Sequence, residues 1–187
     1  FPTRRSSDLR IAVVSKAQSF VSTVQTSAKQ LQSQISANYD EMSSDITKIN
    51  KLTDQIAQLN QNIMTTEANG ASANDLRDQR DNMVDELSKY TNLNVYEDSN
   101  GMYSVVSNGV SLVNGVNKLT LQMSDPIANN TYGVNDYNIE IKEAGTTFMP
   151  ANGILKGQLD THGLQVLAQP AVASQDGRER DASNRRG

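Results

Sequence analysis

Apolar residues recur every seven positions through the first third of the chain, and this spacing is the strongest pattern in the sequence. The series comprises Val14, Val21, Ala28, Ile35, Met42, Ile49, Ile56 and Ile63. A second apolar set accompanies it at offsets of three or four residues, comprising Val24, Leu31, Tyr39, Ile46, Leu52 and Leu59. Sustained heptads of this kind predict a long α-helix that packs in the manner of a coiled coil.

The predicted long helix has no Pro or Gly within residues 10–69. At a rise of about 1.5 Å per residue it would be roughly 90 Å long. The sequence allows a break at Ser36–Asn38, because Ser and Asn side chains compete for backbone hydrogen bonds. The dipeptide Asn69-Gly70 predicts the end of the helix, since Gly readily adopts the left-handed conformation found after helix C-termini.

A second, shorter helix is predicted over residues 75–90, with Ser72 or Asn74 as its N-cap. Its apolar stripe comprises Leu76, Met83, Val84, Leu87 and Tyr90. The short connection makes the two helices antiparallel neighbours in a helical hairpin. The second helix spans only about 24 Å, so we expect the surplus apolar seam of the long helix to need a further helix, from a missing part of the chain or from a neighbouring subunit.

The second helix carries an alternation of acids and bases in "NDLRDQRDNMVDEL". The spacing of Arg77 and Asp81 predicts an ion pair one helical turn apart. Arg80 falls near the apolar stripe, so its stem is expected to cover the seam while its guanidinium pairs with an acid. A cation site on Asp78, Asp81 and Asp85 is the alternative, but three acids on one helix face more often form a solvated surface.

The pattern changes at Asn92, where short alternating stretches of β-forming residues meet at Asn-Gly dipeptides. This arrangement predicts an antiparallel β-meander over residues 93–123. A loop containing Pro126 follows, then a strand within "YNIEIKE", and the apolar run "ILKGQLD" is expected to resume helix. The fold class predicted is therefore α+β: a long heptad-bearing helix in a helical hairpin, followed by a small β-meander subdomain.

Composition and charge narrow the function classes. Residues 10–164 carry 11 basic and 17 acidic side chains, which argues against a nonspecific nucleic-acid-binding surface. The absence of Cys excludes disulfide scaffolds and thiolate chemistry. No apolar run approaches the roughly 18 residues that a membrane span needs. The N-terminus also lacks the apolar core of a secretory signal peptide.

The two ends of the chain differ from its middle. The opening "FPTRRSSDL" resembles a translated sequencing adapter, and residues 168–187 have no apolar period and four Arg. We therefore expect an interior fragment of a longer protein, with an artefactual or disordered leader and tail. The predicted organisation is a leader over 1–9, a helical coiled-coil-like domain over 10–91, a β-rich domain over 92–152, a return segment toward the helices over 153–167, and a tail over 168–187.

Signals for chemistry are weak. The single His, His162, has no nucleophile motif near it. The stretch "EDSNGMYS" loosely resembles a calcium loop, but Tyr96 occupies the position that requires a carboxylate, so a hairpin turn is favoured. No phosphate-binding, zinc-protease or dinucleotide motif is present. We predict no enzyme activity, no cofactor, no metal site and no small-molecule substrate.

Two stretches together resemble the flagellar hook-associated protein 1 family of hook–filament junction proteins. The first, "INKLTDQIAQLNQNI", is similar to the family's I-x-x-L-x-x-Q-I-x-x-L-N on a long helix. The second runs from the family's N-D-L-x-D-Q-R-D stretch into strands ending near "LVNG". Residues matching that second motif are Asn74, Asp75, Leu76, Asp78, Gln79, Arg80 and Asp81. "GILKGQLD" is similar to the family's G-x-L-x-G-L-L-D, except that Gln158 replaces an apolar residue.

The resemblance implies a structural subunit of the extracellular bacterial flagellum, exported by the type III pathway without a cleaved signal peptide. It implies packing into a homo-oligomeric ring and against neighbouring hook and filament junction proteins, and an export chaperone for the missing C-terminal segment. The seam residues and Arg80 would then serve assembly, with no nucleic acid or membrane as partner. The alternatives are another flagellar axial protein, such as flagellin or hook-associated protein 3, and an unrelated coiled-coil adapter module.

Overall fold

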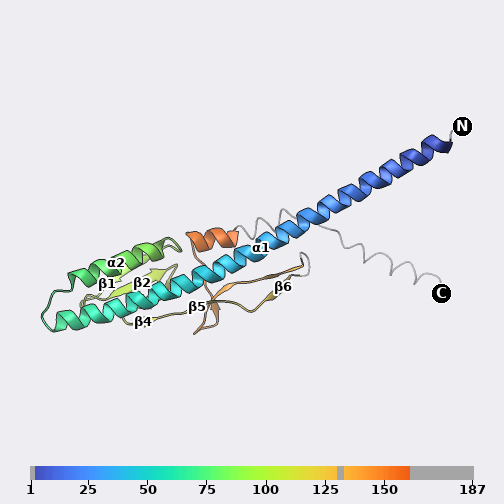
Figure 1. Ribbon diagram of the computed structural model, residues 1–187. Helices are drawn as coiled ribbons and strands as arrows, with labels where there is room; N and C mark the ends of the chain where they lie inside the picture. The colour runs from blue at the N-terminus through green and yellow to red at the C-terminus, as the bar shows by residue number, and fades with distance from the viewer. Residues whose placement is uncertain (1–2, 130–132, 161–187) are drawn as a thin grey trace, which may run out of the picture.

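The computed structural model describes residues 3–129 and 133–160, and its dominant element is one continuous helix (Figure 1). Helix α1 spans Thr3–Ala68, a length of 66 residues. At about 1.5 Å per residue this corresponds to roughly 100 Å. The helix begins at Thr3 rather than at residue 10, and it continues without a break through Ser36–Asn38.

Helix α1 ends in a glycine-dependent C-cap. Gly70 has a φ of 79°, and its N–H donates to the carbonyl of Glu67 at 2.9 Å. The N–H of Ala71 donates to the carbonyl of Thr66 at 3.2 Å. These two bonds form a Schellman motif, which confirms the predicted helix end at Asn69-Gly70.

Helix α2, Asn74–Ser88, lies beside the C-terminal part of α1 and completes the predicted helical hairpin (Figure 1). Its N-cap residue is Ala73, which makes no side-chain capping bond, so neither Ser72 nor Asn74 has the predicted capping role. Ala73 is instead buried with 3% of its surface exposed, so packing rather than a capping side chain holds this end.

The predicted β-meander is present as a four-stranded antiparallel sheet with strands in sequence order. Its strands are β1 (Asn94–Glu97), β2 (Tyr103–Ser107), β3 (Val110–Asn114) and β4 (Asn117–Lys118). Asn108 and Gly109 form the two-residue turn between β2 and β3, with φ angles of 47° and 82°. Two left-handed residues give the turn whose twist matches that of the flanking strands, as the Asn-Gly dipeptide predicts.

The chain then departs from the predicted meander and loop. β5 (Leu121–Met123) leaves the first sheet and joins β8 (Ile139–Ile141) and β9 (Thr146–Thr147) in a second one. The stretch predicted as a loop contains a hairpin of β6 (Ile127–Asn129) and β7 (Val134–Asp136). Strands of three residues are too short to show an alternating pattern, which explains why the sequence did not reveal them.

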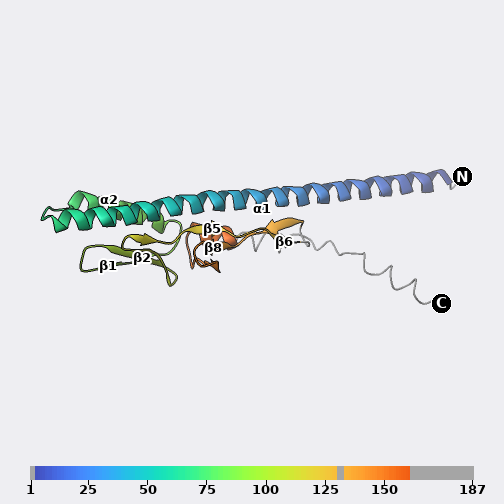
Figure 2. The same cartoon turned by 90° about the horizontal axis from the view of Figure 1, so that it is seen from below.

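A single hydrophobic core joins the helices to the sheets. It runs from Ile35 along α1 and takes in residues from α2, from both larger sheets and from the segment after β9. The sheet residues that point into it are Val105, Leu112, Val113, Leu121, Ile139 and Ile141. The sheets lie along the C-terminal half of α1, while the N-terminal part of α1 extends past the described strands (Figures 1 and 2).

The chain returns to the helices after β9, and the described residues 154–160 are helical, as predicted. Gly153 brings this segment onto the end of α2, with a φ of 91°. A Cβ atom at Gly153 would lie 2.6 Å from the carbonyl oxygen of Tyr90. Residues 161–187, which include the predicted tail, the end of the return segment and His162, lie outside the described residues.

The two glycines of the return segment give a matched test of this joint. We expect Gly153→Ala to lower the free energy of unfolding by about 1–3 kcal/mol, because it adds a backbone clash to a left-handed φ. Gly157→Ala places a Cβ in open space within a helix. It should raise stability by up to about 1 kcal/mol through helix propensity. Urea unfolding measures both, and equal effects of the two substitutions would contradict the described joint.

Candidate functional site: the packing surface of helix α1

The predicted seam divides into a buried part and an uncovered part. Seven seam residues of α1 are buried: Ile35, Met42, Ile46, Ile49, Leu52, Ile56 and Ile63. Four are half-buried: Val24, Ala28, Leu31 and Leu59. Val14 and Val21 are exposed. On α2, Leu87 is fully buried, and Leu76 and Met83 are half-buried.

The buried part of the seam is covered by α2 and by strands. Helix α1 contacts α2, β3, β4, β5 and β7. The structure therefore differs from the expectation that the surplus seam beyond α2 needs another helix, because the sheets cover it as far as Ile35. An amphipathic helix can bury its stripe against the apolar face of a sheet as well as against a helix.

An apolar surface remains on α1 ahead of this core. Its large exposed side chains are Leu9, Ile11, Val13, Val14, Phe20 and Val21, each with 51–69% of its surface accessible. Phe20 is the largest of them, and Val13 and Val14 lie two turns before it. Clustered apolar side chains on one helix indicate a surface for association with another protein segment.

Arg80 of the second motif joins α1, α2 and the β1–β2 hairpin. Its side chain is fully buried, and Nη1 donates to Asn60 Oδ1 at 3.0 Å and to the Gly101 carbonyl at 2.6 Å. Its guanidinium carbon lies 3.3 Å from the centre of the Tyr103 ring. The expected ion pair is absent, since no described carboxylate lies within salt-bridge distance of Arg80. A neutral amide, a carbonyl and an aromatic face stabilise this cation instead.

Tyr103 is enclosed by two consecutive motif residues. Arg80 lies over its ring, and Asp81 accepts a hydrogen bond from its hydroxyl. Burial raises the pKa of Tyr103, and the bond to Asp81 raises it further. The other motif residues, Asn74, Asp75, Asp78 and Gln79, are exposed. The motif therefore serves the interior through Leu76, Arg80 and Asp81, and the surface through the rest.

Two Asn side chains of α1 bind strand backbone in the way that a neighbouring strand would. Asn60 Nδ2 donates to the carbonyls of Tyr103 and Gly115, and its Oδ1 accepts the Tyr103 N–H at 3.0 Å. Asn50 makes the same pair of bonds to Leu121, at 2.8 and 2.9 Å. These residues fix where the two sheets sit along α1. Sequence reasoning noted Asn60 only as a motif position, although a polar residue beside the seam was an available signal.

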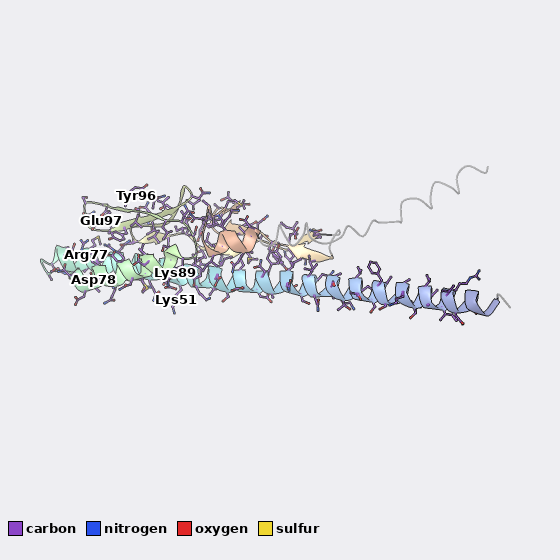
Figure 3. All side chains as sticks on the ribbon, turned by 90° about the horizontal axis from the view of Figure 1, so that it is seen from above. Lys51, Arg77, Asp78, Lys89, Tyr96 and Glu97 are labelled. Atoms are coloured by element: carbon purple, nitrogen blue, oxygen red, sulfur yellow. The ribbon has the colours of Figure 1, made fainter. Side chains whose placement is uncertain are left out.

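Arg77 bridges three elements on the surface (Figure 3). It donates to both carboxylate oxygens of Glu67 on α1, at 2.9 and 2.8 Å, and to Glu97 on β1 at 2.5 Å. The hydrogen bonds from Arg77 lower the pKa of Glu67. They also raise the pKa of Arg77. The predicted pair with Asp81 does not form, because Arg77 points back to α1 and across to β1.

A pocket of about 530 Å³ opens between α1 and the β6–β7 hairpin. Tyr39 and Tyr137 meet there edge to face, with ring centres 4.9 Å apart. Burial raises the pKa of Tyr39 to about 12. Within the described residues no three His, Asp or Glu side chains gather as a metal site, so Asp78, Asp81 and Asp85 do not form the alternative cation site. None of the described helices is long and apolar enough to cross a bilayer.

Comparison with known proteins identifies relatives over most of the chain. The model of a family described as the flagellar hook-associated protein FlgK helical domain matches residues 3–173, a range that extends into both the predicted leader and the predicted tail. Flagellar hook-associated protein 1 of Salmonella typhimurium is 38% identical over 109 residues, which are 57% of this chain and 20% of that protein. The Escherichia coli protein of the same name is 34% identical over the same length.

A solved structure shares the fold. The flagellar hook junction protein FlgK from Burkholderia pseudomallei aligns with a TM-score of 0.64 and 28% identity. The alignment covers 78% of this chain and 27% of that one. The chain thus spans 20% of the length of the curated relatives that it matches.

The buried Arg80 and the surface Arg77 should respond differently to the same substitution. We expect Arg80→Met to cost about 2 kcal/mol or more, because it leaves the buried Gly101 carbonyl without a donor and removes the ring contact. Arg77→Met should cost less, and its effect should shrink as salt is added. Urea unfolding at low and high ionic strength measures both. Equal losses, or a strong salt dependence at Arg80 alone, would contradict the described contacts.

The exposed apolar surface of α1 should drive association. We expect the protein to form concentration-dependent oligomers, and the pair Phe20→Gln and Val21→Gln to weaken them. The same pair should leave the melting temperature nearly unchanged, since neither side chain is in the core. Sedimentation velocity measures the association, with Ser19→Gln and Ser22→Gln as the control. A strictly monomeric protein at high concentration would show that this surface does not associate.

Proposed function

The chain belongs to the flagellar hook-associated protein FlgK helical domain family, and from this premise we propose that it is part of a structural subunit of the bacterial flagellum at the hook–filament junction. It acts by packing against other subunits and not by catalysis. The single observation that carries the proposal is the family match across residues 3–173. The Burkholderia pseudomallei structure supports it, because that hook junction protein has the same fold over 78% of this chain.

The shape of the molecule suits a packing role. A rigid helix, braced along half its length by α2 and the sheets, holds an uncovered apolar surface on its other half. In the proposed assembly Val14 and Val21 lie against a further helical segment or a neighbouring subunit. Bracing one half of the helix fixes the direction of the other, which favours one packing geometry over many.

The partners follow from the same proposal. Copies of the subunit form a homo-oligomeric ring, and the ring contacts the neighbouring hook and filament junction proteins. The subunit reaches the extracellular flagellum by type III export, without a cleaved signal peptide and with an export chaperone acting on a C-terminal segment. Support for these partners comes from the relatives, whose names place them at the hook or the hook junction.

A chimera tests the proposal at the level of this chain. Residues 10–160 replace the structurally equivalent segment of flagellar hook-associated protein 1 in a Salmonella typhimurium strain that lacks its own copy. Because every subunit then carries the same replacement, contacts between identical subunits are preserved. We expect the chimera at the junction by immunogold labelling, with filaments attached.

The control is the same chimera with Ile56→Asp, which places a charge in the core and should abolish both results. A chimera that is exported and folded, yet absent from the junction, would contradict the proposed function.

A further inference from the structure

The helical residues 154–160 are anchored to α2 at their beginning. The N–H groups of Ile154 and Leu155 donate to the carbonyls of Lys89 and Tyr90, each at 3.1 Å. Free N–H groups at a helix start and free carbonyls at a helix end therefore satisfy each other. The short helix continues in line with α2 along α1 (Figure 1). The close approach at Gly153 makes this anchor a pivot with little room to slide.

A second contact holds the same helix against α1, one turn further on. Gln158 Nε2 donates to Asp45 Oδ2 at 2.9 Å, and Asn38 Nδ2 donates to the Gln158 carbonyl at 2.9 Å. Asn38 and Asp45 are seven residues apart on α1, with the fully buried Met42 between them. Helix α1 thus holds Gln158 by its side chain and by its backbone at once.

The contact is poorly suited to stabilising the fold. Gln158 and Asp45 are 8% and 4% exposed, so both polar groups are withdrawn from water. Gln158 Oε1 is buried without a hydrogen-bond partner among the described residues. Lys48 gives Asp45 its one other side-chain bond, at 2.9 Å. A buried polar pair that is only partly satisfied stabilises a protein less than an apolar pair of similar size.

What a buried amide–carboxylate bond supplies is direction. It forms in one relative orientation, whereas apolar side chains tolerate many. A helix held at one end by a pivot needs a second fixed point to define its axis. Gln158 lies at that second point, where the family pattern carries an apolar residue.

We propose that Asp45 and Gln158, assisted by Asn38, form an orientation lock that fixes the helix of residues 154–160 along α1. Gln158 is the positioning residue of this lock. The lock sets the direction in which the chain leaves residue 160, and the cost is a partly unsatisfied polar group in the core. The inference goes beyond the proposed function and does not depend on it.

Distance measurements between spin labels test the lock, and the absence of Cys from the chain makes labelling clean. Labels on Glu41→Cys and Asp160→Cys, both exposed positions, report the distance from α1 to the end of the helix. In the full chain we expect one narrow distance distribution. In the variant carrying Asp45→Leu and Gln158→Leu we expect an unchanged or higher melting temperature, with a broader distribution or a second distance.

The matched control makes the same two chemical changes at exposed positions, Asp85→Leu and Gln61→Leu, and should keep the narrow distribution. A single unchanged distance in the core variant would overturn the proposal, because the pair would then fix nothing. Undocking of the helix with a lower melting temperature would also overturn it, because the pair would then supply stability rather than orientation. Amide exchange of Ile154 and Leu155 shows in each variant whether the pivot is intact.

Discussion

The apolar stripe of α1 can be covered only by other parts of the chain or by other molecules, because a straight helix cannot fold back onto itself. This constraint organises the molecule. Burying a large apolar side chain contributes about 1.5–3 kcal/mol, and seven seam residues of α1 are buried between Ile35 and Ile63. Everything that follows α1 in the described chain lies along this stretch: first α2, then the sheets, then the helix at 154–160. The N-terminal part of α1 has no such cover and keeps its apolar side chains at the surface.

Apolar contact holds these elements to α1, but it does not say where along the helix each should sit. Polar side chains on or near the seam supply that information. Asn60 and Asn50 each bind the backbone of one strand, Arg80 joins both helices to the β1–β2 hairpin, and Asp45 binds the returning helix. Each contact is buried or half-buried, so a shift along α1 would leave polar groups unpaired at about 1–3 kcal/mol each. Position on the helix is thus encoded by a few polar residues within an apolar stripe.

The sequence predicted the parts of the fold that rest on long or local patterns. Eight consecutive heptads identified α1, and Asn108-Gly109 identified a hairpin turn because its two left-handed residues are a local requirement. The short strands β6, β7 and β9 were beyond prediction, since two or three residues show no period. Arg80 was placed at the seam correctly but given the wrong partner. Its true contacts, Asn60, Gly101 and Tyr103, come from three separate elements, and helical spacing reveals neighbours on one helix only. The cover of α1 by sheets was missed for the same reason: a seam predicts that a partner exists without specifying its secondary structure.

The central claim is that cover by the rest of the chain, and not the intrinsic stability of a long helix, keeps α1 ordered from Ile35 onward. Amide hydrogen exchange resolved along α1, at a concentration where the protein is monomeric, tests it most directly. The account predicts strong protection from Ile35 to Ile63 and exchange that is faster by orders of magnitude before Val24, where the helix is uncovered. Uniform protection along the whole of α1 in the monomer would contradict it.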